Sequence, residues 1–177
     1  MGFWSDIDFG AIEIQAGLKD RTRFRYQNGP LKFQIPRGLC QWGVSQYKTF
    51  NVEVDNPEFI QWWRALETHL CPQEPFKSNL TGGSLRVKID DSAYIFDGES
   101  KQIVPEIREG LFQGQDLSCM VYVDSTYFFN GTWGLTVRAY QVRFYGGDVA
   151  LGATAADETT VSALPKGVCS FLPLESD

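Results

Sequence analysis

The sequence has few of the side chains from which catalytic centres are built. Only one histidine, His69, occurs among its 177 residues. A Ser-His-Asp triad would depend on that single imidazole, and the G-x-S-x-G motif that often presents the nucleophile is missing. The HExxH, GxGxxG and Walker motifs are missing as well. We therefore predict that the chain is not an enzyme and that it holds no cofactor and no metal ion.

Closely spaced cysteines and long apolar runs are also missing. The four cysteines, Cys40, Cys71, Cys119 and Cys169, stand far apart, so they form no zinc knuckle. The sequence begins without the basic start and apolar run of a secretory signal. We therefore favour free thiols over two disulfides. No run approaches the roughly 18 apolar residues of a membrane helix, so no membrane partner is expected.

Charge is unevenly distributed along the chain. The formal net charge is −6, which taken alone argues against nucleic acid. The acidity lies mainly at the two ends, whereas the stretch from Arg21 to Lys48 contains six cations and no acid. We therefore divide the chain into an acidic N-terminal arm (1–20), a β domain (21–145) and an acidic C-terminal tail (146–177).

Alternating apolar and polar residues predict strands. Two such pairs of segments flank Asn28-Gly29 and Asn130-Gly131, and Asn-Gly tolerates the positive φ of a two-residue hairpin turn. The segments 47–54, 84–89, 93–96 and 117–123 follow the same pattern. In the segment 84–89, alternation directs Leu85, Val87 and Ile89 inward. The chain thus contains about seven or eight strands and two hairpins.

One helix is predicted in the middle of the chain. Asn56 offers a capping side chain and Pro57 suits the first helical turn. Apolar residues then recur at spacings of three and four from Phe59 to Leu70, which places most of them on one stripe. The helix is expected to end near Cys71. The predicted fold is therefore mostly β, either a small closed barrel or a sandwich, with one amphipathic helix.

Aromatic residues are frequent, at 14% of the chain. Basic side chains interleaved with aromatic rings suit a single-stranded nucleic acid, because cations meet phosphates and rings stack on unpaired bases. The alternative is that the rings fill the core and the cations form a solvated face. The candidates for phosphate contacts are Arg23, Arg25, Lys32, Arg37, Arg138 and Arg143, and those for stacking are Trp42, Tyr47 and Trp133.

Residues 84–145 also resemble a known family. The segment SLRVKIDDSAYIFDG precedes the strand LSCMVYV and the segment YFFNGTWGLTVRAYQVRFY. This succession resembles the C-terminal half of the OB-fold single-stranded DNA-binding proteins of tailed phages and large nucleocytoplasmic DNA viruses. The match is carried by Asn130-Gly131, Trp133-Gly134 and Gln141-Val142-Arg143.

The resemblance implies an OB-like barrel with a helix inserted between its strands. It implies binding of single-stranded DNA without sequence specificity, in replication or recombination, in the cytoplasm or nucleus of an infected host cell. It further implies an acidic C-terminal tail that competes with DNA and recruits other viral proteins.

A structural role in a virus is the alternative. A minor capsid or virion component could use the same small β domain, with the N-terminal arm and the C-terminal tail bridging neighbouring proteins. Such a protein would reside in the virion. A homo-oligomer is compatible with either role, and binding of single-stranded DNA would distinguish the two.

Overall fold

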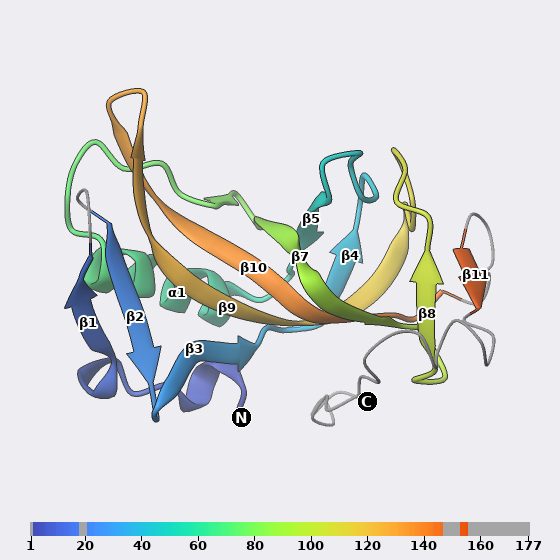
Figure 1. Cartoon of the computed structure of the whole chain (residues 1–177), viewed down its shortest axis with the longest axis horizontal. Coiled ribbons are helices and arrows are strands. Elements are labelled where there is room, and N and C mark those ends of the chain that lie inside the picture. Colours follow the sequence, from blue (N-terminus) through green and yellow to red (C-terminus); the bar gives the residue numbers. More distant parts are fainter. Residues whose placement is uncertain (1, 18–20, 147–152, 156–177) are drawn as a thin grey trace.

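The computed structural model describes residues 2–17, 21–146 and 153–155. Figure 1 shows long, strongly curved strands that cross the molecule, with one α-helix packed beside them. The elements are the 3-10 helices η1 (Trp4–Asp6) and η2 (Phe9–Ala11), the α-helix α1 (Pro57–Leu70), and the strands β1 (Glu13–Ala16), β2 (Thr22–Tyr26), β3 (Gly29–Gln34), β4 (Gly38–Cys40), β5 (Thr49–Glu53), β6 (Leu80–Thr81), β7 (Ser84–Phe96), β8 (Gln102–Pro105), β9 (Gln115–Phe129), β10 (Thr132–Phe144) and β11 (Ala153–Ala155).

Five of these strands close into a barrel. β4 pairs with β5, β5 with β7, β7 with β10, β10 with β9, and β9 returns to β4. All five pairings are antiparallel except β7–β10, which is parallel. β3, β2 and β1 extend the sheet beyond β9, and β8 and β11 extend it beyond β7. The predicted fold class is confirmed, and of its two forms the chain adopts the small, OB-like closed barrel.

Both predicted hairpins are present. The β9–β10 turn consists of Asn130 and Gly131, which both have positive φ, as the two-residue turn requires. The β2–β3 turn lies one residue earlier than Asn-Gly predicts. Its central residues are Gln27 and Asn28, with φ of 51° and 63°, and Gly29 already pairs with Tyr26 in the ladder.

The predicted helix is confirmed at both ends. The side chain of Asn56 accepts a hydrogen bond from the amide of Phe59 at 3.0 Å, which satisfies one free amide of the first turn. The helix ends at Leu70, and Cys71 closes it. Trp63 is fully buried and its ring lies 6.1 Å from that of Phe33 on β3. The tryptophan-rich stripe therefore packs on the sheet, as its spacing predicts.

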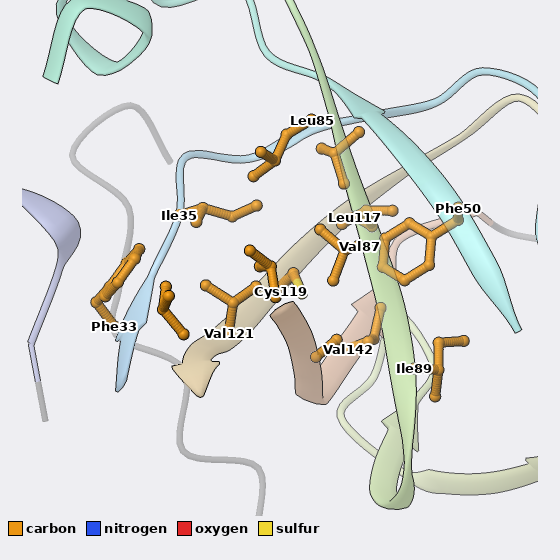
Figure 2. Close-up of a cluster of buried hydrophobic side chains, with 14 of the residues drawn as sticks. Phe33, Ile35, Phe50, Leu85, Val87, Ile89, Leu117, Cys119, Val121 and Val142 are labelled. Atoms are coloured by element: carbon orange, nitrogen blue, oxygen red, sulfur yellow. The ribbon is translucent and has the colours of Figure 1, made fainter. Parts of the chain in front are cut away.

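The core lies inside the barrel and beneath the helix. Figure 2 shows apolar side chains of β3, β5, β7, β9 and β10 converging on one volume, with Cys119 near its centre. Leu85, Val87 and Ile89 of β7 point inward and are at most 4% exposed, as alternation predicts. Each fully buried aliphatic or aromatic side chain of this kind contributes about 1.5–3 kcal/mol through removal from water.

The chain ends relate to the barrel in different ways. In the predicted arm, Trp4 packs on Phe59 and Trp62, and the ring of Phe9 stacks on His69. These residues belong to the packed body. Of the predicted tail, the structure describes Gly146 and β11, which pairs with β8. The remaining tail residues, including Cys169, lie outside the described residues.

Cys40, Cys71 and Cys119 are buried free thiols. No helix in the described residues is long and apolar enough to cross a membrane.

Candidate nucleic-acid interface

A groove of about 370 Å³ lies on the outer face of the barrel. Its floor is formed by β5, β7 and β10. One wall is the segment 72–79 between α1 and β6, which we call the strap. The groove is lined by Thr49 and Asn51 of β5, Ser84, Arg86 and Lys88 of β7, Tyr127 of β9, Leu135, Thr136 and Val137 of β10, and Lys77, Ser78, Asn79 and Thr81.

Strand register aligns side chains in rows across this face. Residues directly opposite in a ladder point to the same side of the sheet. Thr49 lies opposite Lys88, Lys88 opposite Arg138, Arg138 opposite Tyr122, and Tyr122 opposite Lys32. One row therefore places three cations and a tyrosine on a single surface that runs from β5 to β3. We call it the cationic row.

The groove itself is cationic. Lys77, Arg86 and Lys88 are exposed, and none of the three forms an ion pair with the residues that the structure describes. Their ladder partners on β5, Asn51 for Arg86 and Thr49 for Lys88, are neutral. An anion entering the groove therefore meets these cations without first displacing a carboxylate.

Exposed aromatic rings lie in the β4–β5 loop and at the tip of the β9–β10 hairpin. Trp42 and Tyr47, in the β4–β5 loop, are 64% and 73% exposed. Phe128 and Phe129, at the tip of the β9–β10 hairpin, are 54% and 69% exposed. Rings exposed in this way are available for stacking on unpaired bases. In Figure 1 the hairpin tip and the β4–β5 loop rise on the same side of the barrel, on either side of β7.

A glycine shapes the part of the groove that the β9–β10 hairpin forms. Gly134 lies opposite Tyr127 in the β9–β10 ladder, and a Cβ at this position would collide with the tyrosine ring. The absence of a side chain therefore lets the ring of Tyr127 lie across β10 and line the groove. Gly134 thus permits a close approach of the Tyr127 ring to β10 that any side chain at this position would block.

Arg138 and Tyr122 share one carboxylate, that of Asp90. The Tyr122 hydroxyl donates to Asp90 at 2.8 Å, and an Arg138 nitrogen lies 3.8 Å from the same oxygen. Burial alone would raise the pKa of Asp90, but hydrogen bonds from Ser92 and Tyr122 and the charge of Arg138 lower it. Burial and the nearby carboxylate raise the pKa of Tyr122 to about 12. At neutral pH this part of the row is an ionised carboxylate held by a neutral phenol and a cation.

The structure brings some of the other predicted cations to the same face. Lys32 is half-buried, with its ammonium 4.6 Å above the ring of Tyr140. Arg23 lies opposite Ser125, which lies opposite Thr136 of the groove. Arg25 faces Glu13 across the β1–β2 ladder, and its guanidinium donates to the carbonyl of Asn28 at 3.1 Å. Arg23 and Lys32 therefore continue the cationic surface, and Arg25 belongs to its edge.

Arg37 and Arg143 lie elsewhere. Their guanidinium carbons stand 3.8 and 4.6 Å from the ring centre of Tyr145. Arg37 also forms a salt bridge with Asp116 at 3.5 Å, and Arg143 donates to the carbonyl of Gly98 at 2.6 Å. These two cations are engaged in holding the C-terminal end of β10 and do not line the groove.

Trp133 is the predicted stacking residue that the structure places least openly. It is half-buried, its ring lies 5.0 Å from that of Phe128, and it packs against the core. The sequence interpretation did not select Lys77, Arg86, Lys88, Phe128 or Phe129. Arg86 and Lys88 could have been found, because the same alternation that sends Leu85 and Val87 inward sends them outward. Lys77 had no such signal, since it belongs to no strand.

This arrangement suits a flexible polyanion that carries flat rings. Cations line the floor and one wall, neutral polar side chains separate them, and exposed aromatic rings lie in the β4–β5 loop and at the β9–β10 hairpin. The described residues contain no cluster of three or more metal-ligating side chains. The fold and the site together define an OB-like β-barrel with a cationic groove on the face of β5 and β7.

No family model matches the chain, and no curated protein matches its sequence. Among solved structures, the crystal structure of gp2.5, a single-stranded DNA-binding protein encoded by bacteriophage T7, matches with a TM-score of 0.40 and 11% sequence identity. The match covers 82% of this chain and 100% of the gp2.5 chain.

Proposed function

We propose that this chain binds single-stranded DNA without sequence specificity, in the groove on β5, β7 and β10. The observation that carries the proposal is the set of three exposed cations, Lys77, Arg86 and Lys88, that have no ion-pair partner among the described residues. The phosphates of DNA would supply the negatively charged partners that these three cations lack. In OB-folds, strands 2 and 3 of the barrel and two adjoining loops bind oligonucleotides, and here β5 and β7 occupy those positions.

The aromatic rings supply the second half of the recognition. Bases of a single strand are unstacked and stack readily on exposed rings, whatever their sequence. Tyr47 and Trp42 lie just before β5, and Phe128 and Phe129 lie just before the β9–β10 turn. A single strand of DNA that runs along the groove would contact cations in the middle and aromatic rings at both ends. No base-specific set of hydrogen-bonding side chains is needed for this mode.

The length of the cationic row indicates how many nucleotides the site can contact. It crosses five strands, and neighbouring strands are about 4.8 Å apart, so it spans about 19 Å. This length accommodates several nucleotides, within the range of about 4–16 per OB-fold. Lys32 extends the positive surface beyond the groove toward β3, whereas the charge of Arg138 is offset by Asp90. The setting implied by the resemblance, replication or recombination in a large DNA virus or phage, stays a prediction, as do the location in the host cell and the viral partners.

Tryptophan fluorescence during titration with oligo(dT) tests the proposal. Trp42 is exposed in the β4–β5 loop, so its emission should be quenched when a base stacks on it. Binding should weaken as salt is added, because each phosphate contact releases a condensed counterion. The same titration with double-stranded DNA and with oligo(U) measures the preference for single-stranded DNA. Absence of any response at low salt, or binding that salt does not weaken, would overturn the proposal.

A further inference from the structure

Glu67 is a buried carboxylate that neither the barrel nor the groove explains at first sight. It lies on α1 and is 4% exposed, although its side chain carries a charge that water would solvate well. An ionised group is rarely placed in such a position unless hydrogen bonds compensate its lost hydration. Its partners therefore indicate what the carboxylate does.

The partners of Glu67 belong to the strap. The Ser78 hydroxyl lies 2.8 Å from both carboxylate oxygens, and the amide of Asn79 donates to one of them at 3.2 Å. The Ser78 oxygen in turn accepts from the amide of Leu80 at 2.9 Å. Burial raises the pKa of Glu67, and the hydrogen bonds from Ser78 and Asn79 oppose that rise. The carboxylate thus fixes the backbone of the strap where it enters β6.

The strap separates two cavities. On its outer side Lys77, Ser78 and Asn79 line the groove. On its inner side Glu67 and Ser78 line a cleft of about 600 Å³ between α1 and the strap. With a cleft behind it, the strap is not supported by close packing along its whole length. Directional bonds hold it at several points. The carbonyl of Trp133 accepts from the amide of Lys77 at 2.8 Å, the amide of Arg86 donates to the carbonyl of Asn79 at 2.8 Å, and Ser78 and Asn79 both donate to Glu67.

We propose that Glu67 is a positioning residue for DNA binding, which sets the strap so that Lys77 faces the groove. The inference rests on the proposed function and adds to it a control point on the opposite side of the strap. Glu67 itself touches no ligand. It acts through Ser78 and Asn79, the two residues that follow Lys77, and so fixes the place from which the lysine reaches a phosphate.

A double-mutant cycle between Glu67→Gln and Lys77→Ala tests the assignment. Lys77→Ala should weaken oligo(dT) binding several-fold and lower the salt slope by about 0.7, the value for one phosphate contact on a single strand. Glu67→Gln should produce the same two changes, although it removes a negative charge. In the Lys77→Ala background, Glu67→Gln should have no further effect on affinity. Hydrogen exchange of the amides of residues 77–80 should increase in Glu67→Gln.

Controls separate positioning from stability. Glu58→Gln removes an exposed carboxylate from the same helix and should leave affinity, salt slope and strap exchange unchanged. Ser78→Ala removes the same contact from the strap side and replaces Glu67→Gln if that variant fails to fold. A purely structural role would lower the melting temperature but leave affinity unchanged in the folded protein.

The outcomes are distinguishable from failure of the proposed function. If the unchanged chain does not bind oligo(dT), both the function and this role are overturned. If the unchanged chain binds and Lys77→Ala weakens binding, but Glu67→Gln and Ser78→Ala do not, only the positioning role is overturned. Additive effects of Glu67→Gln and Lys77→Ala would likewise overturn it.

Discussion

Cations beside β10 are held in two opposite ways. Beside the first half of β10, up to Arg138, Arg86 and Lys88 of the adjoining strand β7 project from the sheet and form no ion pair with the described residues. At the other end, Arg37 and Arg143 close on the ring of Tyr145, with Asp116 and a backbone carbonyl as further partners. Both ends are basic in sequence, yet only the first presents its charge to an incoming anion.

This difference teaches that the neighbours of a cation decide its use. A guanidinium stacked on a ring and bonded to a carbonyl has already exchanged its hydration for protein contacts. A phosphate would have to break those contacts before binding. A lysine opposite a threonine has only water to give up. The groove end is therefore suited to ligand binding and the Tyr145 end to structural support.

The largest expected effect comes from removing the groove charges. The double variant Arg86→Gln, Lys88→Gln should bind oligo(dT) far more weakly, because two phosphate contacts are lost from the centre of the site. The salt slope should fall by about 1.4, at about 0.7 for each contact with a single strand. Fluorescence titrations over a range of salt concentrations measure both quantities.

A charge-matched variant at the other end serves as the control. Arg37→Gln with Lys101→Gln removes the same charge from residues outside the groove, where Lys101 pairs with Glu99. This variant should keep nearly all of its affinity, although loss of the Arg37 contacts should lower its stability. If both double variants lose affinity equally, net charge alone governs binding and the contrast between the two ends is wrong.

Aromatic residues provide the next test of the same contrast. Tyr47→Ala removes an exposed ring and should reduce affinity by up to about 1–3 kcal/mol, the range for stacking on one base, with little change in melting temperature. Trp133→Ala should mainly lower the free energy of unfolding, by less than the about 3–5 kcal/mol of a fully buried tryptophan. Thermal melts beside titrations measure both. Reversal of the two outcomes would show that Trp133 is the stacking residue and Tyr47 the support.

Much of the fold followed from local rules. The cap at Asn56, the spacing of apolar residues to Leu70 and the turn at Asn130-Gly131 each act over a few residues, so the sequence shows them directly. The β2–β3 turn was displaced by one residue because Gly29 is taken into the ladder opposite Tyr26. Closure of the barrel depends on the parallel pairing of β7 with β10, and no local pattern encodes a contact between segments so far apart.

The site could be predicted only in part, for a related reason. Alternation shows which cations point outward, and it predicts this for Arg86 as well as for Lys32. Alternation does not show what lies opposite. Arg143 and Arg138 lie in the same predicted strand and cannot be told apart by pattern. Arg143 is nevertheless a structural residue, because its guanidinium donates to the carbonyl of Gly98. Lys77 enters the groove through a strap whose position depends on Glu67, ten residues earlier on another element.

A smaller effect, of opposite sign, is expected from the acids beside the cationic row. Asp91 forms a salt bridge with Lys48 at 3.2 Å, and both side chains are well exposed. An exposed pair of this kind contributes at most about 1 kcal/mol, so Asp91→Asn should barely change stability. It should release Lys48 near the groove and increase affinity for oligo(dT) modestly, most visibly at low salt. Weaker binding by Asp91→Asn would mean that the carboxylate positions Lys48 for the ligand.

The smallest effects concern two carboxylates whose pKa values shift in opposite directions. The pKa of Glu67 is raised from 4.5 by burial, so its contribution to stability is full below pH 4.5 and is lost as pH rises through the folded-state value. The pKa of Asp90 is lowered from 3.8 because hydrogen bonds and Arg138 outweigh its partial burial. Its contribution is present above pH 3.8 and is lost as pH falls through the folded-state value.

Urea unfolding of the unchanged chain, Glu67→Gln and Asp90→Asn over a series of pH values measures these contributions. Relative to Glu67→Gln, the unchanged chain should lose stability as pH rises above 4.5. Relative to Asp90→Asn, it should lose stability as pH falls into the acidic range. The opposite slopes follow from the two environments, because Glu67 is buried behind the strap whereas Asp90 lies beside a cation and a phenol. Parallel slopes would show that burial governs both carboxylates and that Arg138 does not hold Asp90 in its ionised form.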